Sequence, residues 1–201
     1  MMKTFNLKTL AFAAVLPAAL IGTPALANEP AAKGASSMAA AAQAPITEAE
    51  VRAAQQAWGN ALVAIATEYD TKGFAAAKQL AEQVVDSAYG YQMGPVLFKP
   101  TLAAAPQTFR TEREGAIAYF VGGNPRFKGD SGFAIKGWRS FEIDNAAILL
   151  KGNTAISMGN VTVIDAKGNR TTVDKTWGYS RGNDGKLRIV LHHSSLPYQA
   201  N

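Results

Sequence analysis

Apolar and polar positions follow a helical period over the first part of the folded chain. Thr47 and Glu50 match the T-x-x-E pattern of a capping box directly before an amphipathic run, which predicts a helix to about residue 68. Its apolar stripe, which we expect to be core, consists of Val51, Trp58, Leu62 and Ile65. After a break at 70–73, a second stripe of the same period predicts a helix over about 74–88.

The pattern is irregular between the second helix and residue 137. Residues 96–101 predict a short strand that Pro100 stops, and residues 107–113 fit either a second short strand or an extended loop. The apolar run 114–121, which contains Tyr119, predicts a helix broken by the Gly-Gly-Asn-Pro segment that follows. The loop 122–137 is rich in glycine and charge, and we expect Phe127 and Phe133 to anchor it to the body.

From Trp138 onward the period is that of β-structure. Runs at about 139–150, 154–165, 170–181 and 186–195 are separated by short connectors that carry the Gly and Asn of tight hairpin turns. They predict a four-stranded antiparallel meander. Helices followed by a meander predict an α+β domain, with N-terminal helices packed on a strongly curved, mainly antiparallel sheet that forms a cone with an internal pocket.

The last strand, which reads Ile-Val-Leu-His-His-Ser-Ser-Leu-Pro over 189–197, becomes polar within one residue and carries every histidine of the chain. Because side chains alternate along a strand, His192 and Ser194 share one face, and His193 and Ser195 share the other. The two imidazoles therefore point in opposite directions. A zinc site needs three or four ligands, and here one pocket receives at most one imidazole and no thiolate, since cysteine is absent.

The polar strand end also has a plain structural explanation, in which both His-Ser pairs cap the strand and the backbone satisfies the imidazoles. A Ser and a His two residues apart do not form a nucleophilic dyad, and the chain has no G-x-S-x-G elbow. If one face lines a pocket, we favour His192 and Ser194, because the apolar neighbours of His193 and Ser195 fit core packing. The face of His193 and Ser195 is the alternative.

Composition indicates the compartment and excludes some partners. Lys3 and Lys8, a short apolar stretch at 10–21 and Ala-Leu-Ala at 25–27 predict a cleaved signal peptide over 1–27, hence a soluble periplasmic or secreted bacterial protein. A disordered linker at 28–45 and a single domain over 46–201 would follow. Cleavage removes two lysines and no acid, which takes the net charge from +5 to +3, and no basic run is interleaved with aromatics. We therefore expect no nucleic-acid partner and no membrane attachment.

Five segments together resemble the iota-class carbonic anhydrases, and the likeness covers about 46–198. The segments are Leu-Phe-Lys-Pro-Thr-Leu-Ala at 97–103, Ala-Tyr-Phe-Val-Gly at 118–122, Asp-Ser-Gly-Phe-Ala at 130–134, Ser-Met-Gly-Asn at 157–160 and Leu-His-His-Ser-Ser-Leu-Pro at 191–197. Each is weak alone. The Phe-Lys-Pro-Thr segment and the His-His-Ser-Ser ending, in this order, are a specific combination.

The resemblance implies the cone-shaped α+β fold of nuclear transport factor two, scytalone dehydratase and SnoaL-like proteins. It also implies reversible hydration of carbon dioxide to bicarbonate, and a homodimer or higher homo-oligomer. Members are described as using zinc or manganese, or as working without metal. In the metal-free mode, Thr101, Tyr119 and Ser194 would hold bicarbonate, and His192 would take or relay the proton. We expect no cofactor, because opposed histidines suit that mode.

Two other functions stay open at this point. One is a non-catalytic module for self-association or small-ligand binding on the same fold, and the other is a different cone-fold lyase or isomerase. Enzymes of the latter kind usually pair a pocket carboxylate with His or Tyr, and no Asp or Glu is clearly directed at the strand of His192. Tyr119 also fits a core tyrosine with one bonded hydroxyl. The residues do not identify the group that would deprotonate water.

Overall fold

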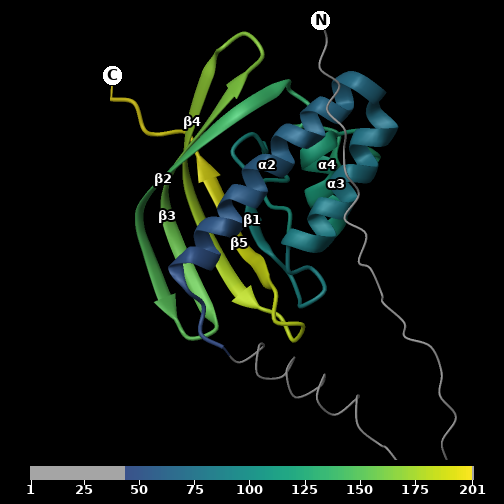
Figure 1. The fold of residues 1–201 in the computed structure, drawn as a ribbon. Coiled ribbons are helices and arrows are strands. Elements are labelled where there is room, and N and C mark those ends of the chain that lie inside the picture. Colours follow the sequence, from purple (N-terminus) through teal and green to yellow (C-terminus); the bar gives the residue numbers. More distant parts are fainter. Residues whose placement is uncertain (1–43, 201) are drawn as a thin grey trace, which may run out of the picture.

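The computed structural model describes residues 44–200, and Figure 1 shows its fold. The signal peptide expected at 1–27 and nearly all of the linker expected at 28–45 lie outside the described residues. Up to residue 121 the elements are helices apart from one three-residue strand, and the four long strands follow, which confirms the α+β class. The elements are α2 (Glu48–Lys72), α3 (Phe74–Ala88), β1 (Leu97–Lys99), α4 (Arg113–Val121), the short 3-10 helix η1 (Pro125–Phe127), β2 (Trp138–Lys151), β3 (Thr154–Asp165), β4 (Arg170–Arg181) and β5 (Leu187–Ser195).

The first helix begins at the predicted capping box. The Thr47 hydroxyl accepts a hydrogen bond from the Glu50 amide at 3.3 Å, and the Thr47 amide donates to the Glu50 carboxylate at 2.9 Å. The helix continues to Lys72, four residues beyond the predicted end, because residues 69–72 are polar without being helix breakers and Lys72 pairs with Glu68 at 2.9 Å. Gly73 ends it with a φ of 83°, so the break predicted at 70–73 is this one glycine.

Within the described residues, five strands form one sheet in the order β1-β5-β4-β3-β2. The antiparallel meander from β2 to β5 is confirmed, and register shifts between β2 and β3 and between β4 and β5 bend it. The strand predicted at 96–101 is only β1, which lies parallel to β5 with Phe98 opposite His192. Residues 107–112 form the extended loop rather than a strand, and Arg113 already begins α4. The Arg110 amide donates to the Phe98 carbonyl at 2.8 Å and joins this loop to β1.

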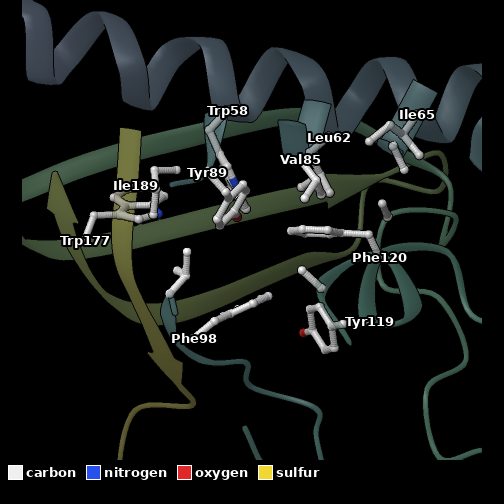
Figure 2. Packing of buried hydrophobic residues seen from close by; sticks show 14 of the residues in the cluster. Trp58, Leu62, Ile65, Val85, Tyr89, Phe98, Tyr119, Phe120, Trp177 and Ile189 are labelled. Carbon is white, nitrogen blue, oxygen red and sulfur yellow. The ribbon is translucent and has the colours of Figure 1, made fainter. Parts of the chain in front are cut away.

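Helix α2 crosses one face of the curved sheet, and the core lies between them (Figure 1). Figure 2 shows Trp58, Leu62 and Ile65 projecting from α2 into this interior, and all three are buried as the stripe predicted. Gln55 fills the polar gap in the stripe and exchanges two hydrogen bonds with Asn145, each 2.8 Å long. The packing of helix on sheet thus continues past a polar position without an unsatisfied amide.

The loop between α4 and β2 is anchored by the two expected aromatics. Phe127 is buried under the guanidinium of Arg110, 4.8 Å from its ring centre. Phe133 stacks on Tyr119 with ring centres 5.6 Å apart, so the loop covers the end of α4. None of the helices in residues 44–200 is long and apolar enough to cross a bilayer.

Candidate active site

The end of β5 separates the two His-Ser pairs onto opposite faces of the sheet. His192 and Ser194 point inward and are 2% and 4% exposed, whereas His193 is exposed and Ser195 is half-buried on the outer face. His193 and Ser195 line an open surface groove of about 390 Å³. The two histidines therefore have different surroundings, and the internal cavity receives His192 and Ser194.

Strand β1 brings the Phe-Lys-Pro-Thr segment against the inner face of β5. Its parallel register stacks Phe98 on the His192 ring with centres 4.3 Å apart. Pro100 ends the strand, and the chain turns so that the Thr101 hydroxyl donates to the Ser194 hydroxyl at 2.8 Å. Two residues 93 positions apart in the sequence thus form one hydroxyl pair.

Tyr119 reaches the same cavity from α4. Its ring meets Phe98 edge-on at 5.5 Å and lies against Phe133 on the other side (Figure 2 shows its hydroxyl pointing away from α4). Burial raises the pKa of the Tyr119 hydroxyl, and a hydrogen bond with the Leu102 backbone partly opposes that shift. The hydroxyl therefore stays protonated and can act only as a neutral donor or acceptor at physiological pH.

These side chains enclose a small cavity of about 20 Å³. One part of its wall is aliphatic and aromatic, and the other part carries hydroxyl, imidazole and amine groups. The lining residues are Trp58, Thr101, Tyr119, Phe120, Phe133, Val161, Val163, Thr171, Val173, Lys175, His192 and Ser194. This set contains all four residues predicted for the site and no carboxylate, and it suits a substrate of very few atoms.

Lys175 was missed by the sequence analysis. It lies on β4 opposite Ser194 and is buried, and its amine is 2.7 Å from Nε2 of His192. Burial lowers the pKa of Lys175 to about 7. Strand alternation could have identified it, because Val173, Lys175 and Trp177 share the inward face, where a lysine stands in an otherwise apolar row.

The imidazole of His192 has a partner on each nitrogen. Nδ1 lies 2.8 Å from the hydroxyl of Tyr89, which follows α3, and Nε2 faces the amine of Lys175. The indole of Trp58 donates to the same Tyr89 hydroxyl at 3.0 Å, so four side chains from four elements form one buried chain. Burial is the main reason that the pKa of His192 lies well below its usual value. Neither ring nitrogen is left free to take a proton from the cavity.

Within residues 44–200, no group of three or more His, Cys, Asp or Glu side chains is placed to hold a metal ion. The polar groups of the cavity are mostly neutral donors. Such groups can bind a small anion by hydrogen bonds and can stabilise negative charge that develops on oxygen. The basic side chains among the lining residues are the His192 imidazole, whose nitrogens are both hydrogen-bonded, and the Lys175 amine.

Comparison with known proteins gives three findings. The sequence matches the family described as metal-independent carbonic anhydrase over residues 49–196. A protein of that description from Nostoc sp. (strain PCC 7120 / SAG 25.82 / UTEX 2576) is 64% identical over 154 residues, which are 77% of this chain and 75% of that protein. A crystal structure of an iota-carbonic anhydrase from a cyanobacterium, complexed with bicarbonate, is 63% identical and covers 78% of this chain and 95% of its own, with a TM-score of 0.77.

Proposed function

The chain belongs to the metal-independent carbonic anhydrase family, and from this premise we propose that its small internal cavity is the place where it hydrates carbon dioxide reversibly to bicarbonate. The observation that carries the assignment is the hydroxyl pair of Thr101 and Ser194 beside Tyr119 in a half-apolar cavity. The similar cyanobacterial enzyme has been crystallised with bicarbonate, the product of the forward reaction.

The aliphatic side of the cavity suits the substrate. Carbon dioxide has no net dipole and gains little from hydrogen bonds, so it would rest against Val161, Val163 and Val173. The polar side suits the product, because bicarbonate carries a full charge that needs donors. A cavity with one wall of each kind can hold both, and the reaction moves charge toward the polar wall.

The hydroxyl pair has a defined direction, which fixes one donor. Thr101 donates its proton to the Ser194 oxygen, so the proton of Ser194 is directed elsewhere and is free to bond a cavity oxygen. Tyr119 supplies a second neutral donor, since its raised pKa keeps it protonated. As water adds to carbon dioxide, negative charge grows on the substrate oxygens, and these two donors would stabilise it in a site from which bulk water is excluded.

Stopped-flow assays of carbon dioxide hydration test this proposal. Activity should survive treatment with a chelator. Ser194→Ala should lower kcat/KM by about 10²-fold, as does loss of one donor to a developing oxyanion, and Thr101→Val should lower it by about 10-fold because it acts through Ser194. Ser195→Ala is the matched control, since this neighbour lies on the outer face, and it should stay within about twofold of the unmodified protein. Equal activity of the Ser194 and Ser195 variants would contradict the assignment.

We also propose that the protein forms a homodimer or a higher homo-oligomer through the outer face of its sheet. Leu149, Ile156 and Met158 are exposed there on neighbouring strands, and antiparallel pairing places them on one face. Light scattering after size-exclusion chromatography gives the mass in solution. A monomer at micromolar concentration would contradict the proposal.

Export to the periplasm or the medium is a further proposal, supported by the pattern of residues 1–27, which lie outside the described part of the structure. Cleavage after Ala27 predicts a mature protein that begins at Asn28. Mass spectrometry of the protein purified from an exported fraction would show that terminus. An intact leader in that fraction would contradict the cleavage site.

A further inference from the structure

Hydration of carbon dioxide by water releases one proton, and the neutral hydroxyl donors of the cavity cannot take it. Among the side chains that line the cavity in the described residues, only His192 and Lys175 are basic. The identity of the proton acceptor therefore depends on where these two groups already hold their protons. The hydrogen bonds around His192 determine where these protons are held.

Protons can be assigned along this series of hydrogen bonds by starting from Trp58, whose role as a donor is fixed. The indole of Trp58 is a donor only, so it donates to the oxygen of Tyr89. The proton of the Tyr89 hydroxyl then has one acceptor within the contacts that the structure gives it, which is Nδ1 of His192. Burial raises the pKa of Tyr89 well above its usual value, so this hydroxyl keeps its proton.

The tautomer of His192 follows from this direction. Because Nδ1 accepts, the proton of the neutral imidazole is on Nε2, and Nε2 donates to the amine of Lys175 at 2.7 Å. An ammonium has three donors and no lone pair, so it cannot accept this bond. The arrangement in which every member of the chain is satisfied therefore requires Lys175 to be a neutral amine.

The surroundings of Lys175 agree with a neutral amine. No carboxylate lines the cavity, and the titratable groups around the amine are His192 on β5, Tyr89 beyond it after α3, and Tyr119 on α4. Asp174 and His193 lie on the outer face of the sheet and are exposed. The amine sits 4.8 Å and 5.3 Å from the ring centres of Trp58 and Trp177, whose faces attract an ammonium, but this attraction is smaller than the cost of removing a cation from water without a counter-ion.

On the basis of the function proposed above, we propose that Lys175 is the general base of the reaction, and that His192 and Tyr89 are positioning residues. The amine turns its lone pair from Nε2–H of His192 to the attacking water and accepts a proton from it, while the water oxygen bonds to the carbon of carbon dioxide. One carbon–oxygen π pair moves onto an oxygen held by Ser194 and Tyr119. The products are bicarbonate and the ammonium of Lys175, which then loses its proton to buffer.

The same hydrogen-bond chain explains how the base is reset. An ammonium at Lys175 has no lone pair for the Nε2 proton of His192, and the hydrogen bond from the Tyr89 hydroxyl to Nδ1 keeps that proton on Nε2, so Nε2–H would face a cation without an acceptor. A buried unsatisfied donor disfavours that state, so the chain drives the proton back out of the site. The pKa of Lys175 near 7 matches the value at which one group can both take and release a proton at neutral pH.

Three variants of Lys175 test the assignment through the pH dependence of kcat/KM for hydration. The unmodified protein should gain activity as pH rises through about 7, the pKa of Lys175. Lys175→Met and Lys175→Arg should both lose about 10²-fold or more and lose this midpoint, because a thioether and a permanently charged guanidinium cannot act as a base. Lys175→Ala should recover activity with a small added primary amine, whereas Lys175→Met, which fills the space, should not.

Tyr89→Phe tests the positioning chain and keeps the question decidable when Lys175→Met does not fold. Without the Tyr89 hydroxyl, Nδ1 of His192 accepts no hydrogen bond, so the imidazole no longer has a preferred tautomer and Nε2 can accept from an ammonium at Lys175 without the loss of a Tyr89 bond. The midpoint of the pH profile should therefore move to higher pH. An unchanged or lower midpoint would overturn the role of Tyr89. Near-unmodified rates and an unchanged profile in Lys175→Arg would overturn the base assignment alone, whereas an unmodified protein with no hydration above the buffer rate would overturn the proposed function.

Discussion

Two buried clusters in this protein each contain a basic side chain, and in only one of them does a carboxylate pair with it. Arg110 is 3% exposed and pairs with Asp130 through two hydrogen bonds of 2.9 Å and 2.6 Å, while its remaining donors bond the carbonyls of Gln107 and Phe109. Lys175 is buried to a similar extent, but its closest polar partner is a neutral imidazole. A buried cation keeps its charge where a carboxylate compensates it, and a buried amine without one is held neutral.

This difference separates a structural brace from a reactive group. The Arg110–Asp130 pair ties the loop before α4 to the loop after it, and the hydroxyl of Tyr91 adds a bond to the Arg110 carbonyl at 2.8 Å. The loops it joins flank α4, which carries Tyr119. Lys175, by contrast, gains no ion pair from its burial. Burying the Lys175 amine without a counter-ion lowers the stability of the fold. A role of the amine in the chemistry of the cavity accounts for this cost.

The largest effect on stability is expected from breaking the Arg110–Asp130 pair. Asp130→Ala leaves the Arg110 guanidinium buried without its counter-ion, and the free energy of unfolding should fall by about 3–5 kcal/mol. The double variant Arg110→Met with Asp130→Leu removes both charges and should lose much less. Urea denaturation followed by circular dichroism measures both. Equal losses in the single and double variants would show that packing, not the uncompensated charge, is responsible.

The next effect concerns the pH dependence of stability that Lys175 produces. Its pKa is about 7 in the folded protein, against the usual value near 10.4 in the unfolded chain. Between pH 7 and 10 the unfolded chain therefore binds more protons at this position, and the free energy of unfolding should rise with pH by at most about 1.4 kcal/mol per unit.

Comparison with Lys175→Met isolates this contribution, because other titrating groups cancel in the difference. Urea denaturation of both proteins at pH 7, 8 and 9 should show the unmodified protein gaining on the variant as pH rises. A constant difference over this range would mean that the lysine is charged in the folded state, and the contrast with Arg110 would disappear.

The smallest effect is expected at an exposed pair of the same charge type as the brace. Arg113 and Asp86 form an ion pair with both side chains about half exposed, and the Arg113 guanidinium lowers the pKa of Asp86. Asp86→Asn should lower the free energy of unfolding by less than about 1 kcal/mol at low salt, and by nothing measurable at high salt. A loss as large as that of Asp130→Ala would show that burial is not what distinguishes the two pairs.

Much of the fold could be predicted because its information is local. The capping box, both long helices and the four strands of the meander follow from periodicity and turn residues, and each lies within a few residues of its predicted place. The end of α2 was misplaced because propensity does not stop a helix at polar residues, whereas a glycine in the left-handed region does. The partner of β1 could not be predicted, since pairing with β5 joins segments some 90 residues apart.

The candidate site was predictable to a smaller extent. Alternation along β5 separates His192 from His193 whatever the partner strand, and the family resemblance supplied Thr101 and Tyr119. Lys175 was overlooked because a charged residue in a strand is usually solvated, although alternation along β4 places it on the same face as Val173 and Trp177. Tyr89 was not considered, because its role depends on a contact with His192 across 103 positions.

The sequence by itself thus determined the elements, their order, and the opposition of the two histidines, because helix capping, turns and strand alternation act over a few residues. Only the tertiary structure decided the chemistry of the site. Hydrogen bonds between side chains from α2, β4, β5 and the residue after α3 set which nitrogen of His192 carries a proton, and burial without a carboxylate set the charge of Lys175. Proton positions depend on what surrounds a group in space, and that environment forms only when the sheet closes over α2.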